Sequence, residues 1–174
     1  MKTMETTLEV EELDWPTYPE IIDSSMHLKS GREAKVCKHR DFAIKISKKD
    51  LDKSFYSTYE ISSMQNEYEV ATFLYENEIA IPKPWGLFNI NFRISPETII
   101  KVPSFIMEYI SGTRVDELSR VEVKYNKLEE KANKEIERIR KLGVKLNDFG
   151  TVNRTWSLKR KKVYFIDFTG WIIN

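Results

Sequence analysis

Three oxygen-bearing side chains near the carboxyl end carry the strongest chemical signal in the sequence. Asp148 is followed five residues later by Asn153, and a hydrophobic run at residues 163–166 leads directly into Asp167. Carboxylate and amide oxygens are the ligands that Mg²⁺ prefers, and an ionised aspartate nearby can orient an attacking hydroxyl. The order is typical of a site for phosphoryl transfer, with Asp148 as the base and with Asn153 and Asp167 holding the metal.

The letters DFG at residues 148–150 offer a second interpretation, because the metal-binding aspartate of such sites is often followed by Phe and Gly. That interpretation requires another catalytic aspartate about 20 residues upstream, with an asparagine five residues after it. No aspartate lies between Asp116 and Asp148, and the residue five positions after Asp116 is Val121. We therefore assign Asp148 to the catalytic loop and Asp167 to the metal.

The N-terminal half of the chain predicts strands that could cover a ligand. Residues 26–36 are predicted as a strand, a turn at Gly31 and a second strand. Residues 42–46 form a third predicted strand, in which Lys45 alternates with apolar neighbours. Residues 1–20 are acidic and then contain Pro16 and Pro19, which predict an extended or irregular lead-in rather than a strand or helix.

A helix is predicted from residue 62 to about residue 77. Glu67 shares the face of the apolar residues at positions 70, 71 and 74, so an acid at position 67 can point inward. Glu69 is the alternative, but it lies about 200° around the helix from Glu67. We therefore expect Glu67, rather than Glu69, to face the interior.

The remaining elements are two strands and two helices. Residues 86–93 and 99–109 are predicted as strands separated by a turn at residues 95–96, and residues 116–123 as a helical stretch. A stronger helix is predicted over residues 125–142, and Gly143 ends it. Its apolar stripe consists of Tyr125, Leu128, Ala132, Ile136 and Ile139.

Composition limits the class of protein and its partners. The chain has 174 residues, 41% hydrophobic and 32% charged, which is typical of a soluble globular protein. Its formal net charge of +1 gives no bulk attraction to nucleic acid or membranes, so either partner would need a local patch. A single cysteine, Cys37, and the lack of a signal-peptide pattern predict a cytoplasmic protein without disulfides.

In this order, the segments resemble the protein-kinase fold, and in detail the small atypical branch that contains the RIO kinases and the kinase subunit of the KEOPS complex. SGREAKV at residues 30–36 is similar to the one-glycine loop of that branch, and AIK at 43–45 looks like its lysine strand. IPKP at 81–84 and FIMEY at 105–109 are similar to its VPxP segment and its hinge. The match covers roughly residues 26–170.

The resemblance implies an α+β fold with two lobes. Residues 1–20 would be the lead-in segment, and residues 21–112 an antiparallel β N-lobe with one main helix and the hinge. Residues 113–174 would be a strongly reduced helical C-lobe that carries the catalytic loop and the metal-binding strand.

The resemblance also implies that ATP and Mg²⁺ are bound. Lys45 would contact the α- and β-phosphates while an ion pair with Glu67 fixes it, and a cation aimed at phosphate needs such an acid. Asp148 would be the base, and Asn153 and Asp167 the metal ligands. The other implied nucleotide contacts come from the glycine turn, the residue beside the adenine and two backbone groups of the hinge: Gly31, Met107, Glu108 and Ile110.

The implied activity is that of a minimal atypical serine/threonine protein kinase, whose acceptor could be a protein or the chain itself. Leu146 replaces the usual His, Thr169 replaces the Gly of DFG, and no activation segment follows Asp167. These departures support an alternative, a pseudokinase or nucleotide-binding scaffold without phosphotransfer. A small-molecule kinase is a weaker alternative. The expected partners are a nucleotide and an unidentified protein. No membrane is expected as a partner, and nucleic acid is expected only as an indirect one.

Other candidate groups have simpler interpretations. His27 and His39 have no partner spacing, so we expect both to face solvent. No His or acid in the sequence pairs with Cys37, which is therefore expected to serve packing. Residues 159–162 are predicted as the solvated tip of a hairpin, with a phosphate-rich partner as the second option.

Overall fold

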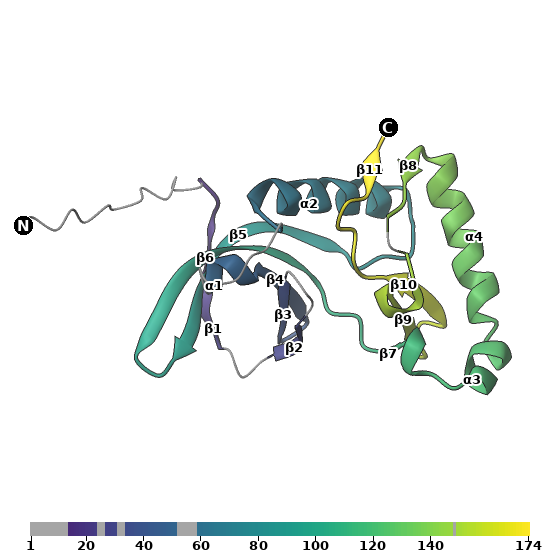
Figure 1. Ribbon diagram of the computed structural model, residues 1–174, viewed down its shortest axis with the longest axis horizontal. Helices are drawn as coiled ribbons and strands as arrows, with labels where there is room; N and C mark the ends of the chain where they lie inside the picture. Colours follow the sequence, from purple (N-terminus) through teal and green to yellow (C-terminus); the bar gives the residue numbers. More distant parts are fainter. Residues whose placement is uncertain (1–13, 24–26, 31–33, 52–58, 148) are drawn as a thin grey trace, which may run out of the picture.

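The computed structural model describes residues 14–23, 27–30, 34–51, 59–147 and 149–174. Gly31 and Asp148, which the sequence assigns to the glycine turn and the catalytic loop, lie outside the described residues. The chain folds into a mixed α+β structure built on a mainly antiparallel sheet (Figure 1).

The main sheet has six strands in the order β1-β5-β6-β4-β3-β2. All neighbouring pairs are antiparallel except β1 and β5, which run parallel. The strands predicted from alternation in the sequence are therefore confirmed, including the three antiparallel strands that precede residue 48. Their bounds are β1 Thr17–Asp23, β2 His27–Ser30, β3 Ala34–His39, β4 Phe42–Ser47, β5 Pro84–Ser95 and β6 Thr98–Glu108.

Strand β1 corrects the expectation that residues 1–20 contain no regular structure. It lies at the edge of the sheet and pairs only with β5, so a proline without an N–H group can be accommodated there. The register shifts between Thr17 and Ile21, on either side of Pro19. The residues just before β1 are also attached to the sheet, because the backbone N–H of Asn89 donates to the Pro16 carbonyl at 3.0 Å.

Helix α2 covers one face of the sheet. It spans Ile61–Glu76, as the sequence predicts, and it lies across β5 and β6 (Figure 1). Strand residues alternate between faces, so Ile44 and Ile46 pack into a core cluster on one side while Lys45 points to the other, toward α2. A shorter helix, α1 at Lys48–Leu51, directly follows β4.

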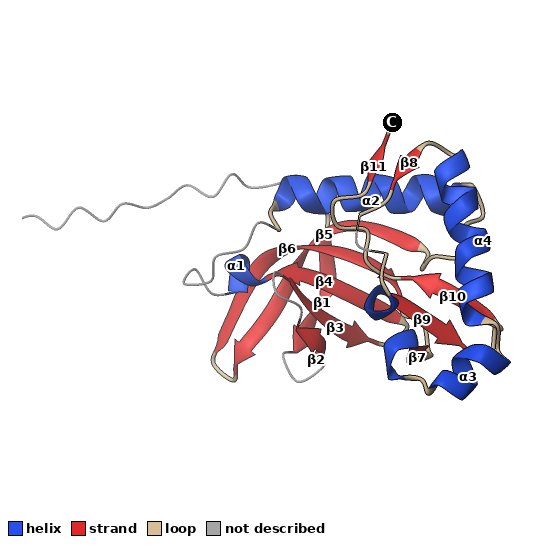
Figure 2. Ribbon diagram, turned by 45° about the vertical axis from the view of Figure 1, so that its right-hand side comes forward, coloured by secondary structure: helices blue, strands red, loops and turns tan. Residues whose placement is uncertain are grey.

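The C-terminal part is built from short helices and two small sheets (Figure 2). Strands β10, β9 and β7 form one sheet, and β11 pairs with β8 in the other. The bounds are β7 Thr113–Arg114, the 3-10 turn η2 Val115–Glu117, α3 Arg120–Tyr125, α4 Leu128–Lys141, β8 Val144–Lys145, the 3-10 turn η3 Thr151–Asn153, β9 Arg154–Ser157, β10 Lys162–Phe165 and β11 Ile172–Ile173.

Helix α4 confirms most of the predicted apolar stripe. Leu128, Ala132, Ile136 and Ile139 are buried, whereas Tyr125 is 85% exposed, so its inclusion in the stripe was wrong. The reason is a break in the helix: α3 ends at Tyr125, and Lys127, with φ of +51°, interrupts the helical spiral before α4 begins. Gly143 adopts φ of +80° and ends α4 as expected.

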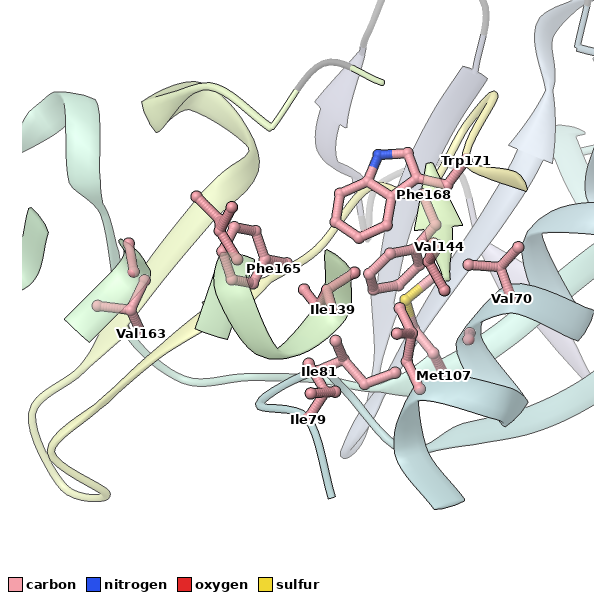
Figure 3. Packing of buried hydrophobic residues seen from close by; sticks show 14 of the residues in the cluster. Val70, Ile79, Ile81, Met107, Ile139, Val144, Val163, Phe165, Phe168 and Trp171 are labelled. Carbon is pink, nitrogen blue, oxygen red and sulfur yellow. The ribbon is translucent and has the colours of Figure 1, made fainter. Parts of the chain in front are cut away.

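Two core clusters hold these elements together. The larger cluster joins α2, α4, β10 and the C-terminal segment, and Figure 3 shows Phe168 and Trp171 packed beside Val144. Trp171 is fully buried, with its ring edge-on to Phe168 at a centroid distance of 5.3 Å. This packing fixes the backbone on either side of Asp167, because fully burying side chains of this size contributes about 1.5–3 kcal/mol each.

The smaller cluster lies on the other face of the main sheet and includes Ile22, Cys37, Ile44, Ile90 and Phe92. Cys37 is fully buried there, as expected of a packing residue, and burial raises the pKa of its thiol. The aromatic rings of the lead-in also pack on the core, Trp15 against the larger cluster and Tyr18 against the smaller one.

His39 corrects another expectation, because it is buried rather than facing solvent. Its Nε2 lies 2.8 Å from Glu20 Oε2, and Tyr18 stands edge-on to its ring. Both partners belong to β1, the strand that the sequence did not predict. The side chain of His27 lies outside the described residues.

No helix in the described residues combines the length and the apolar composition that crossing a lipid bilayer requires.

Candidate functional site

Lys45 is the centre of a polar cluster enclosed by three elements. Its ammonium group donates to both carboxylate oxygens of Glu67, at 2.9 and 2.8 Å, and to Asp167 Oδ1 at 3.0 Å. β4 supplies the cation, α2 supplies Glu67, and the segment after β10 supplies Asp167. Burial alone would lower the pKa of Lys45, but the charges of Glu67 and Asp167 outweigh it and raise the pKa. The lysine is therefore held as a cation.

Helix α2 explains why Glu67 reaches this cluster. Glu67 is fully buried on the same face as Met64, Val70 and Leu74, whereas Glu69 is exposed. The spacing along the helix thus distinguishes the two acids as the sequence predicts. The backbone N–H of Phe168 also donates to Glu67 Oε1 at 3.3 Å, which ties α2 directly to the segment that carries Asp167.

Tyr59 is a member of the cluster that the sequence analysis missed. Its hydroxyl donates to Glu67 Oε2 at 2.6 Å, and its ring centroid lies 4.6 Å from the Lys45 ammonium. Tyr59 is only 1% exposed, and burial together with the Glu67 charge strongly raises its pKa, so the hydroxyl remains a donor. The only sequence signal was an aromatic residue two positions before α2 begins.

Asp167 is held by both its neighbours in space and its own turn. Thr169 Oγ1 donates to Asp167 Oδ1 at 2.7 Å and accepts from the Lys45 ammonium at 3.0 Å. Burial alone would raise the pKa of Asp167, but the Lys45 charge and the Thr169 hydrogen bonds lower it overall. Among the described residues, every hydrogen bond donated to this carboxylate goes to Oδ1.

Asn153 lies beside the same segment. It ends the turn η3 and is 7% exposed, and its backbone carbonyl accepts a hydrogen bond from the Ile166 N–H at 3.0 Å. The chain next to Asp167 is therefore attached to the chain at Asn153. Within the described residues, no group of three or more His, Cys, Asp or Glu side chains could hold a metal ion.

The loop around position 148 is braced by two residues that the sequence analysis did not single out. Arg154 Nε donates to the Phe149 carbonyl at 2.9 Å, and the Trp171 indole N–H donates to the Asn147 carbonyl. These contacts hold the described residues on both sides of position 148.

The predicted hinge residues lie at the end of β6. Met107 is buried in the larger core cluster (Figure 3), and Ile110 is 7% exposed. The backbone N–H groups of Glu108 and Tyr109 donate to the carbonyls of Lys83 and Asp41, at 2.8 and 2.7 Å. The structure shows no described residue accepting a hydrogen bond from the Ile110 N–H.

The carboxylate of Glu108 already accepts hydrogen bonds from neighbouring residues. It accepts from Arg160 and, at 3.3 Å, from the backbone N–H of Lys83. Burial alone would raise the pKa of Glu108, but these hydrogen bonds lower it overall.

Comparison with known proteins rests on structure alone. No protein-family model matches the sequence, and no curated protein matches it. The fold is similar to that of the Rio2 kinase from Chaetomium thermophilum, crystallised as a complex with ADP/Mg²⁺ and phosphoaspartate, with a TM-score of 0.55 and 14% sequence identity. The match covers 83% of this chain and 47% of the other, so this chain spans about half the length of that structure. At this identity the likeness shows the fold alone, and that fold is protein-kinase-like.

Proposed function

We propose that this chain binds ATP with Mg²⁺ between β4, α2 and the segment after β10, and transfers a phosphoryl group as a minimal kinase. The observation that carries the proposal is the buried Lys45 ammonium, paired at once with Glu67 and Asp167. A buried cation kept charged beside an acid suited to a metal is the arrangement that phosphoryl transfer requires.

The phosphates would be held by Lys45, and Glu67 fixes its position. Glu67 is buried and bonded to Tyr59 and to the Phe168 N–H, so it keeps its place when the ammonium turns toward a phosphate. Lys45 would then share its charge between Glu67 and the α- and β-phosphates. Gly31 would allow the strand turn to approach the phosphates closely.

Asp167, after β10, and Asn153, at the end of η3, are the residues that would hold a magnesium ion. Asp167 and Asn153 supply hard oxygen ligands, and Mg²⁺ is usually bound by one or two carboxylates together with substrate phosphates and waters. When bound, Mg²⁺ would offset negative charge on the phosphates. Thr169 would orient Asp167 by holding Oδ1.

The base and the acceptor complete the proposal. Met107 would flank the adenine, and backbone groups of Glu108 and Ile110 would bond to it. Asp148 would accept a hydrogen bond from the acceptor hydroxyl and orient it for in-line attack. The acceptor would be a Ser or Thr of a protein or of this chain. Residues 21–112 and 113–174 would act as two lobes on either side of the nucleotide.

Nucleotide binding is tested by thermal unfolding with ATP and Mg²⁺. At a concentration about 100-fold above Kd, binding adds about 2.7 kcal/mol and raises Tm by about 5–10 °C. We expect Lys45→Met and Asp167→Asn to remove this increase in Tm and Lys49→Met to retain it, because Lys49 pairs with Glu60 at the exposed surface. No increase with the unmodified protein would contradict the proposal.

Phosphoryl transfer is tested with γ-labelled ATP and the protein as its own acceptor or with a generic protein acceptor. We expect Asp148→Ala to abolish labelling and Asp14→Ala, an exposed acid in the lead-in, to leave it unchanged. Binding of ATP without any transfer would overturn the enzymatic part and favour the nucleotide-binding scaffold.

A further inference from the structure

The molecule has a concave surface that includes none of Lys45, Glu67 and Asp167, and it meets the proposed nucleotide site only at Glu108, at the end of β6. An open groove of about 1400 Å³ lies where the end of β6, the residues after α2 and the β9–β10 hairpin meet. Pockets for drug-sized ligands are typically about 300–1,000 Å³. The groove is therefore large enough for a segment of a polymer.

The groove carries a local excess of positive charge. Six basic side chains line it against three acidic ones, although the whole chain has a net charge of only +1. Lys38, Lys83, Lys159 and Lys162 form no ion pair with any described residue. They come from β3, the segment before β5, and the β9–β10 hairpin, so distant parts of the sequence converge here. Of the acids, Glu108 is already paired with Arg160.

Aromatic rings alternate with these cations. Trp85 and Tyr75 line the groove and are 49% and 43% exposed, so both rings are accessible to a partner. The Lys83 ammonium lies 4.3 Å from the Trp85 ring centroid, and the Lys38 ammonium lies 4.2 Å from that of Tyr109. About half of the Trp85 surface remains accessible beside the Lys83 ammonium.

We propose that this groove binds single-stranded nucleic acid, with backbone phosphates on the lysines and bases stacked on Trp85 and Tyr75. Exposed bases stack on aromatic side chains, and a positively charged groove follows the phosphate backbone. An acidic peptide would satisfy the lysines but would leave the two exposed rings without a role. A chain with a net charge of only +1 needs a local basic patch to attract nucleic acid, and the lysines of this groove provide one.

The test is fluorescence anisotropy with a labelled 12-nucleotide single-stranded RNA, measured between 50 and 200 mM salt. Each phosphate contact adds about 0.7 to the slope of log K against log salt for a single strand. We expect the double variant Lys159→Gln, Lys162→Gln to reduce the slope by about 1.4. We expect Trp85→Leu to weaken binding about tenfold through lost stacking. The control is Lys141→Gln, Lys145→Gln, which removes two exposed lysines outside the groove.

Two results would overturn the proposal. One is no RNA binding at 50 mM salt, or equal binding by the groove and control variants. The other is binding of a synthetic peptide with the acidic sequence of residues 1–13 in place of RNA, which would assign the groove to a peptide. None of the substituted residues belongs to the proposed ATP site, so the increase in Tm with ATP and Mg²⁺ should persist in every variant. The two proposals can therefore fail separately.

Discussion

Glu67 Oε2 accepts two hydrogen bonds at once, from the Lys45 ammonium at 2.8 Å and from the Tyr59 hydroxyl at 2.6 Å. The carboxylate is fully buried, so both donors replace water that it would otherwise bind. Lys45 donates one hydrogen bond to each carboxylate oxygen, so without Tyr59 the second lone pair of Oε2 would have no donor. Tyr59 is therefore a positioning residue, which holds the acid that in turn holds the cation.

Removing the Tyr59 hydroxyl should cost stability. Tyr59→Phe keeps the ring beside Lys45 but removes a hydrogen bond to a buried charge, so we expect the free energy of unfolding to fall by about 1–3 kcal/mol. Urea unfolding measures it. The matched control is Tyr75→Phe, because Tyr75 is 43% exposed and its change should be within about 0.5 kcal/mol. Equal effects of the two substitutions would show that the Tyr59 hydroxyl is not a buried donor.

Breaking the buried ion pair should be more costly than breaking an exposed one. Lys45→Met leaves the Glu67 carboxylate without its cation, and we expect a loss of about 3–5 kcal/mol in the free energy of unfolding. Adding Glu67→Leu should recover part of that loss, because the unpaired charge is removed. Lys49→Met, which breaks an exposed pair, should cost less than about 1 kcal/mol. A double variant as unstable as the sum of the two single ones would contradict the coupling.

Thr169 should help to keep the pKa of Asp167 low. The folded-state pKa of Asp167 is below its ordinary value of 3.8, so the carboxylate contributes stability above about pH 3.9 and loses it as pH falls through the folded pKa. Thr169→Val removes the hydroxyl hydrogen bond, so we expect the pKa to rise toward 3.8 and the loss to begin at higher pH. Carboxyl-carbon NMR titration measures the pKa.

The control for this titration is Thr98→Val, at an exposed position at the start of β6. An Asp167 pKa that is unchanged in Thr169→Val, or that shifts equally in Thr98→Val, would show that the hydroxyl does not act on the carboxylate.

Arg154 should hold the loop around position 148 in place. Its guanidinium bonds the Phe149 carbonyl and also pairs with Glu129 at 3.1 Å. A lysine cannot reproduce this fork, so Arg154→Lys should speed amide hydrogen exchange at residues 147–151 while β5 and β6 keep their protection. Arg40→Lys, at an exposed pair with Glu20 far from this loop, is the control. Unchanged exchange in the loop would contradict a bracing role.

The sequence predicts the parts of the fold and site that depend on local periodicity. Alternation identifies β4 and places Lys45 on the opposite side from Ile44, and helical spacing distinguishes Glu67 from Glu69. These patterns report which face of an element is buried. The sequence patterns therefore predict β4, α2 and the strand before Asp167 as separate elements. That these elements meet at one site was predicted from the resemblance.

The missed features depend on contacts between segments distant in sequence. Strand β1 contains Pro19, which is tolerated because the strand pairs on one side only, and local propensity does not show this. The burial of His39 depends on Glu20 from that strand. Tyr59 and Arg154 have no periodic pattern, and their roles follow from where Glu67 and Phe149 lie in space. The groove behind the β9–β10 hairpin is assembled from five segments and has no sequence signature.

The most direct test of the nucleotide site is paramagnetic NMR with ATP and Mn²⁺ in place of Mg²⁺. A metal held by Asp167 and Asn153 should broaden the amide signals of residues 153 and 166–169 first, and Asp167→Asn should abolish this broadening. Signals of the β9–β10 hairpin tip should persist at the same Mn²⁺ concentration. Broadening that begins at residues 159–162, or that is the same in Asp167→Asn, would contradict a metal and nucleotide site at Lys45 and Asp167.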